Sequence, residues 1–144
     1  MSGKIYIVTG RSQSGKSFAV HRLIDKKKRV LVYDPKAFPS DYPSLKKFST
    51  VSALGKSIQG GVTRCRLLDP HRTQFDLFCK LAFTYGRAVP GELWIVADEL
   101  SSVTSPGKAP AWWHIICSQG KGYGLQIVAI TQRPAESDKT CFGN

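Results

Sequence analysis

The chain has 144 residues, which fits one domain with a single hydrophobic core. No apolar run approaches the ~20 residues needed to span a bilayer, and the N-terminal segment lacks the features of a signal peptide. We therefore expect a cytoplasmic protein without an integral membrane segment. The 21 Lys and Arg residues against 10 Asp and Glu give a net charge of +11, which favours a polyanionic partner, nucleic acid first.

The first half of the chain predicts two buried strands joined through a glycine-rich loop and a helix. Residues 4–9 (KIYIVT) form a short apolar run rich in β-branched side chains. Residues 16–28 carry apolar side chains at helical spacing, and residues 29–35 (RVLVYDP) predict a second buried strand that a proline ends. Residues 36–56 are less regular, and a short helix near residues 42–48 is one expectation for them.

The second half continues the alternation of strands and helices. Residues 62–70 predict a third strand, residues 75–86 an amphipathic helix, residues 93–100 (LWIVADEL) a fourth strand and residues 125–134 (LQIVAITQRP) a fifth. Because the strands are apolar throughout, the pattern predicts an α/β fold with a mostly parallel central sheet flanked by helices on both faces. In such sheets ligands bind at the carboxyl ends of the strands.

The stretch TGRSQSGKSF contains the spacing G-x-x-x-x-G-K-S between the first strand and the first helix. Glycines at both ends let the loop curl so that its backbone N–H groups converge on an anion at the helix N-terminus. A lysine can then reach the β- and γ-phosphates, and a serine hydroxyl can ligate Mg²⁺. A Gly/Ser turn that happens to carry a lysine is the simpler alternative, which this context disfavours. The predicted phosphate-binding residues are Gly10, Arg11, Ser12, Gln13, Ser14, Gly15, Lys16 and Ser17.

Polar side chains stand at the ends of the fourth and fifth strands. Asp98 and Glu99 end the run LWIVADEL, where one carboxylate can hold a metal and the other can orient and deprotonate a water. A pair that caps the next helix is the alternative for these carboxylates. Gln132 ends the fifth strand, where an amide could sense the γ-phosphate, although a glutamine at a strand end is commonplace.

The series GRSQSGKS, VYDPK, WIVADE and ITQRP resembles the HerA/FtsK superfamily of P-loop ATPases, most closely short bacteriophage Zot-type and viral genome-packaging ATPases. The resemblance covers the chain from Lys4 to Asp138. It implies a RecA-like domain over residues 1–144 that hydrolyses ATP with Mg²⁺ and moves DNA. Relatives usually carry further strands after the glutamine segment, so either such strands are absent here or the sheet is closed differently.

The same resemblance assigns roles to single residues. It gives Lys16 and Ser17 of the Walker A motif to phosphate and Mg²⁺, Asp98 of the Walker B motif to the metal, Glu99 to the water and Gln132 to γ-phosphate sensing. It further implies that the partners are DNA, copies of the same chain in a ring, and other phage or capsid proteins in the host cytoplasm.

Several residues late in the chain have two alternative roles, one functional and one structural. Arg133 and Lys121 are candidates for a finger that acts in trans across a subunit interface, and a surface or capping role is the alternative for Arg133. Tyr123, between two glycines, and the pair Trp112-Trp113 are candidates for contacts with DNA bases or a neighbouring subunit. A tryptophan that anchors a helix in the core is the alternative for the pair.

Two other functions use the same loop. A small nucleotide kinase would need an arginine-rich lid, whereas residues 101–108 offer only Lys108, and adjacent carboxylates favour water as the acceptor. A nucleotide-gated, Zot-like assembly or morphogenesis factor would use ATP as a switch. ATPase activity with and without DNA separates these functions.

Overall fold

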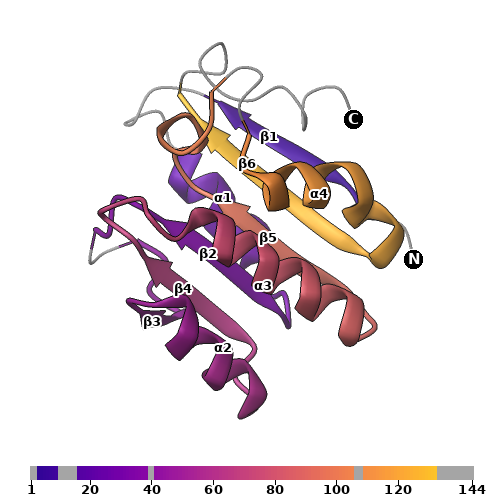
Figure 1. The fold of residues 1–144 in the computed structure, drawn as a ribbon. Helices are drawn as coiled ribbons and strands as arrows, with labels where there is room; N and C mark the ends of the chain where they lie inside the picture. The colour runs from indigo at the N-terminus through magenta and orange to yellow at the C-terminus, as the bar shows by residue number, and fades with distance from the viewer. Residues whose placement is uncertain (1–2, 10–15, 39–40, 106–108, 133–144) are drawn as a thin grey trace.

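The computed structural model describes residues 3–9, 16–38, 41–105 and 109–132, which form one sheet with helices on both faces (Figure 1). Six strands lie in this described part of the chain, all parallel, in the order β1-β6-β5-β2-β4-β3. The strands are β1 (Ile5–Thr9), β2 (Val30–Asp34), β3 (Lys46–Phe48), β4 (Arg64–Leu68), β5 (Leu93–Ala97) and β6 (Leu125–Thr131). The predicted α/β fold with a parallel sheet is confirmed.

The helices divide unequally between the two faces of the sheet. In Figure 1, α2, α3 and α4 lie on the near face, and α1 lies behind the sheet. The described helices are α1 (Lys16–Ile24), α2 (Val51–Gln59), α3 (Phe75–Ala88) and α4 (Ala111–Gln119), with short 3₁₀ turns η1 (Leu100–Ser102) and η2 (Gly120–Tyr123). Within the described residues, no helix combines the length and the apolar character needed to cross a lipid bilayer.

The strands build two separate cores because successive side chains point to opposite faces. In β2, Leu31 and Tyr33 pack in the cluster under α2, α3 and α4, whereas Val30 and Val32 pack under α1. All five residues of β2 and all five of β5 are buried, as expected for central strands of a covered parallel sheet. Side chains of β5 therefore leave the strand alternately toward α1 and toward α3.

The segment between β2 and β4 differs from its sequence-based expectation. Residues 46–48 form the edge strand β3, which pairs with β4, and not the short helix expected near residues 42–48. The strand places two exposed lysines at the sheet edge, a common way of protecting an edge from further pairing. The following helix, α2, was not predicted, although Thr50 accepts a hydrogen bond from the Ala53 amide as its N-cap and Leu54 is buried.

Candidate functional site

The carboxyl ends of β1, β6 and β5 lie side by side at one edge of the sheet. Thr9 is the register partner of Thr131, and Ala97 is the partner of Ala129. Since neighbouring strands are about 4.8 Å apart, the ends of β1 and β5 are separated by about 10 Å, with β6 between them. The loop after β1, the acidic pair after β5 and the glutamine after β6 thus leave the sheet at the same edge.

Helix α1 begins at Lys16, directly after the glycine-rich segment, so the strand and the helix that the motif requires are both present. The backbone of Lys16 and Ser17 forms the first turn of the helix. Residues 10–15 lie outside the described residues, and the phosphate contacts expected of the loop and of these two side chains remain predictions. Val20 and Ile24 anchor α1 in the core on its face of the sheet.

Asp98 follows β5 and is 1% exposed. Its Oδ2 accepts a hydrogen bond from the Tyr42 hydroxyl at 3.0 Å and lies 3.5 Å from Lys36 Nζ. Its Oδ1 is buried without a hydrogen-bond partner among the described residues. Burial raises the pKa of Asp98 above the ordinary carboxyl value, while the positive charge of Lys36 opposes that rise. One oxygen of a buried carboxylate is therefore available to a ligand.

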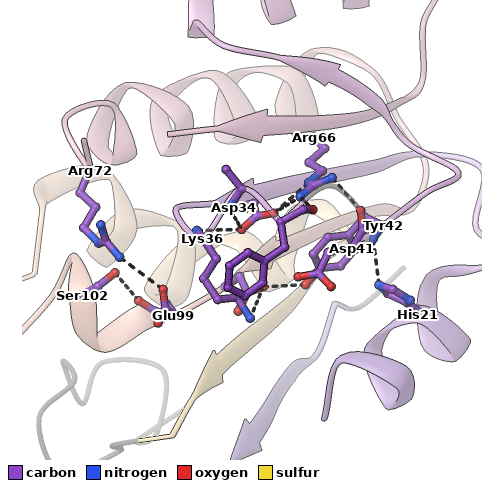
Figure 2. Close-up of polar contacts among 12 residues, drawn as sticks. His21, Asp34, Lys36, Asp41, Tyr42, Arg66, Arg72, Glu99 and Ser102 are labelled. Atoms are coloured by element: carbon purple, nitrogen blue, oxygen red, sulfur yellow. Dashed lines mark hydrogen bonds and ion pairs between the residues drawn. The ribbon is translucent and has the colours of Figure 1, made fainter. Parts of the chain in front are cut away.

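A buried ion pair holds the segment that carries Lys36 and Tyr42 (Figure 2). Asp34 Oδ2 accepts from Arg66 Nε at 2.8 Å and from Arg66 Nη2 at 2.5 Å, and both side chains are fully buried. The same guanidinium donates to the carbonyl oxygens of Phe38 and Asp41, each at 2.6 Å. Arg66 on β4 thereby ties the end of β2 to the residues that contact Asp98.

Tyr42 also connects this segment to α1. Its backbone N–H donates to His21 Nε2 at 3.0 Å, and the two rings meet edge to face with centroids 4.8 Å apart. His21 lies one helical turn after Ser17. Figure 2 shows the contact between His21 and Tyr42. Because the Tyr42 hydroxyl donates to Asp98, a continuous set of contacts runs from the helix that follows the glycine-rich loop, through Tyr42, to Asp98.

Glu99 has a different environment from its neighbour. Its Oε2 lies 3.4 Å from Arg72 Nη2, and the side chains of Glu99 and Arg72 are 23% and 40% exposed. Its backbone has a left-handed φ of 51°, and its carbonyl accepts a hydrogen bond from the Ser102 hydroxyl. An exposed ion pair of this kind contributes about 0–1 kcal/mol, so it can open when a ligand arrives.

No protein-family model matches the chain. The structure is similar to the genome packaging NTPase B204 from Sulfolobus turreted icosahedral virus 2, solved in complex with AMPPCP. The TM-score is 0.76 at 16% sequence identity, over 97% of this chain and 70% of B204. This chain has the P-loop NTPase fold.

This P-loop NTPase chain is also similar to two other proteins. The chain is 33% identical over 139 residues to Protein P9 of Pseudoalteromonas phage PM2, and the match covers 94% of this chain and 62% of P9. The N-terminal domain of zonular occludens toxin from Neisseria meningitidis is similar with a TM-score of 0.55 at 16% identity, over 97% of this chain and 72% of that structure. The resemblance to Zot-type and viral genome-packaging ATPases is thereby confirmed.

The remaining predicted residues lie in different places on this P-loop NTPase fold. Gln132 directly follows β6 at the carboxyl edge and is exposed. Arg133 lies outside the described residues, so its assignment as a finger is untested. Lys121 lies in η2, before β6, at the opposite end of the strand from Gln132. Within one subunit, Lys121 is therefore remote from the site that Gln132 borders.

Sequence reasoning missed four residues around the acidic pair: His21, Tyr42, Arg66 and Arg72. Arg66 had a detectable signal, because an arginine flanked by Cys65 and Leu67 in a strand expected to be buried must itself be buried with a partner. The others come from loops and a helix whose proximity depends on tertiary packing. No local pattern indicated them.

Proposed function

We propose that this P-loop NTPase is a phage-encoded, ATP-hydrolysing motor of the HerA/FtsK type that packages or translocates DNA. The observation that carries the proposal is the strand order, because β6 stands between the strand that leads to the GRSQSGKS loop and the strand that delivers Asp98 and Glu99. Similarity to a protein of phage PM2 and to a genome packaging NTPase supports the DNA-handling role. The host cytoplasm is the corresponding location.

The residues of the site fit a magnesium ion. Asp98 offers one buried carboxylate oxygen without a partner in the described structure, and oxygen atoms are the ligands that Mg²⁺ prefers. The Ser17 hydroxyl is the second protein ligand in the proposal. No group of three or more His, Cys, Asp or Glu side chains in the described ranges could hold a metal by itself, so phosphates and water would complete the coordination. When bound, Mg²⁺ would neutralise negative charge on the phosphates.

The chain's own residues would then perform hydrolysis. Lys16 and the loop N–H groups bind the β- and γ-phosphates and hold them in line with an attacking water. Glu99 orients that water and accepts its proton as the new bond to the γ-phosphorus forms and the bond to the ADP oxygen breaks. Gln132, exposed beside the end of β6, contacts the γ-phosphate or the water. For Glu99 to act, its ion pair with Arg72 must open or be shared with the water.

A nucleotide-gated assembly factor is the second candidate, favoured by the similarity to the zonular occludens toxin domain. Such a protein would bind ATP in the same loop and change partners without sustained turnover. The two functions therefore differ in whether DNA accelerates hydrolysis.

The decisive experiment measures Mg-dependent ATP hydrolysis and ATP affinity, with and without DNA. We expect DNA to increase the rate for the wild-type chain. Glu99→Gln should bind ATP normally and lose ~10²-fold or more in rate, because the metal ligand remains and the base is gone. Lys16→Ala should lose ATP binding.

Two control variants test whether the loss of any carboxylate or any lysine has the same effect as Glu99→Gln or Lys16→Ala. Glu92→Gln removes a carboxylate just before the first residue of the same strand, β5, far from the site, and Lys56→Ala removes an exposed lysine on α2. Without DNA, both should bind and hydrolyse ATP like the wild type. Normal turnover by folded Glu99→Gln or normal ATP binding by folded Lys16→Ala would remove the assignment of the site. ATP binding without DNA-stimulated turnover would favour the assembly factor.

A further inference from the structure

The amino ends of the strands form a second edge of the sheet, opposite the candidate site. In Figure 1 this edge lies at the tails of the arrows, away from the arrowheads. Because all the described strands are parallel, the segments that precede them gather there, together with the C-terminal end of α3. We call these residues the amino-edge surface. Its charged members are Lys4, Asp25, Lys26, Lys27, Lys28, Arg29, Lys46, Arg64, Arg87, Glu92 and Lys121.

The amino-edge surface is strongly positive. Only two of its members are acidic, and one of them, Glu92, accepts a hydrogen bond from Trp94 Nε1 at 2.6 Å. By contrast, three buried carboxylates, Asp34, Asp69 and Asp98, lie at the carboxyl edge. These acidic residues lie at the other end of the described sheet. The amino-edge surface therefore has more positive than negative side chains.

Two arginines hold the backbone of this surface in place through hydrogen bonds. Arg64 donates to the carbonyl oxygens of Ile24 and Lys27 and to Ser44 Oγ. Arg29 donates to the carbonyl oxygens of Val89, Gly91 and Glu92. Since these two guanidiniums are engaged with the protein, they fix the turn at residues 26–28 and the loop at residues 89–92. The exposed lysines of the turn stay available for an anion.

A pocket that contains one aromatic side chain, Tyr123, lies on the amino-edge surface. The pocket, about 260 Å³ in volume, is lined by Arg87, Tyr123, Pro90 and four glycines. Tyr123 is 44% exposed, its ring meets Phe83 edge to face at 5.6 Å, and the Arg87 guanidinium lies 5.7 Å from its centroid. Of the other two aromatic candidates from the sequence, Trp113 is buried against Phe75, and Trp112 is half-buried on α4 beside Phe83.

We infer that the amino-edge surface binds single-stranded DNA, with backbone phosphates on its lysines and Arg87 and one base stacked on Tyr123. A positive groove that tracks the backbone, combined with an exposed aromatic ring, is the usual arrangement for strand binding without sequence preference. The inference rests on the proposed function and locates its DNA contact. Because this surface and the candidate nucleotide site occupy opposite ends of the strands, DNA and ATP bind together without competing.

The test measures affinity for a fluorescent oligothymidylate strand and for a duplex over a series of salt concentrations. The double variant Lys28→Gln/Arg87→Gln should weaken strand binding ~10-fold or more at low salt. The slope of log K against log salt should fall by ~1.4, or ~0.7 for each lost phosphate contact. The matched control Lys56→Gln/Lys80→Gln removes two exposed lysines from α2 and α3, and its slope should stay close to that of the wild type.

Variants of Tyr123 test the proposed stacking of a base separately from the phosphate contacts of the positive side chains. Tyr123→Ala should weaken binding ~5-fold to 100-fold, the range of base–aromatic stacking, and Tyr123→Phe should bind like the wild type. Basal ATP hydrolysis should be unchanged in these variants. If the amino-edge variants bind DNA as the control variant does, the inference is overturned while the proposed function stands. If wild-type chain binds neither strand nor duplex at low salt, the proposed function itself fails.

Discussion

Backbone strain in the described chain is concentrated at the candidate site. Four residues other than glycine have left-handed φ angles, and each follows the carboxyl end of a strand: Ala37 (57°), Tyr42 (49°), Arg72 (59°) and Glu99 (51°). Such conformations cost of order 1–3 kcal/mol each and persist where the surrounding structure imposes them. Tyr42 contacts Asp98, and Arg72 pairs with Glu99. Two of the strained residues, Tyr42 and Arg72, therefore contact the side chains of Asp98 and Glu99 directly.

We expect Asp98 to reduce the stability of the ligand-free fold at neutral pH. Burial raises its pKa in the folded state above the unfolded value. Its stabilising contribution is thus present below the ordinary carboxyl pKa and is lost as the pH rises through the raised value. We expect Asp98→Asn to raise the melting temperature at neutral pH, with a gain that shrinks in acid, and to lose the further stabilisation by Mg-ATP.

Thermal unfolding across a pH series, with and without Mg-ATP, measures both effects. Asp25→Asn, which neutralises an exposed carboxylate, should melt close to the wild type at every pH. A lower melting temperature for Asp98→Asn throughout the series would mean that the attraction of Lys36 exceeds the cost of burial.

At the scale of elements, the segment between β2 and β3 depends on one side chain from β4. Arg66 binds Asp34 and the carbonyl oxygens of Phe38 and Asp41, and residues of this segment in turn contact Asp98. The positions of Tyr42 and Lys36 at the site are therefore set by Arg66 of β4, which bonds to Asp34 and to backbone carbonyl oxygens.

Removal of Arg66 should be costly because it leaves a buried carboxylate without its partner. We expect Arg66→Met to lower the free energy of unfolding by ~3–5 kcal/mol, measured by urea denaturation. The double variant Asp34→Asn/Arg66→Met removes both charges and should recover part of that loss. A double variant that is less stable than Arg66→Met would show that Asp34 is satisfied by the Lys36 and Ala37 amides alone.

The alternation of apolar runs was enough to predict the parallel sheet, because buried strands such as LWIVA are continuous and their connections are helical. Strand-end reasoning also placed Asp98 and Glu99 at the carboxyl end of the fourth predicted strand, where they lie directly after β5. It did not find β3, whose three residues KKF are stabilised by pairing with β4 and have no pattern of their own. Likewise Tyr42 and Arg72 reach the site through loops, and their proximity is a property of the assembled sheet.

At the scale of the whole molecule, we propose that hydrolysis requires a cation donated by a second subunit. A cation donated in trans can supply ~10³-fold or more in rate. We expect the isolated chain to be a poor ATPase whose specific activity rises with protein concentration or on DNA. Whichever of Arg133→Ala and Lys121→Ala removes the finger should regain activity when mixed with Glu99→Gln, because each subunit then retains what the other lacks.

The two mixtures also identify the finger. Only the true finger variant should be slow when assayed alone, and only its mixture with Glu99→Gln should exceed the summed activity of its two components. Sedimentation at the same concentrations gives the oligomeric state. Full activity of a demonstrated monomer would exclude a finger in trans and return the kinase to consideration.

The position of β1 in the sheet also determines when the nucleotide site can form during synthesis. Among the described strands β1 pairs with β6 alone, and Lys4 N donates to Gln126 Oε1 across a separation of 122 residues. A ribosome needs on the order of 10 s to make the intervening chain, and during that time β1 is an unpaired apolar strand. Contacts so distant in sequence also slow folding. Strand β1, which leads to the candidate site, is thus synthesised before the other described strands and is among the last of them to acquire its neighbour.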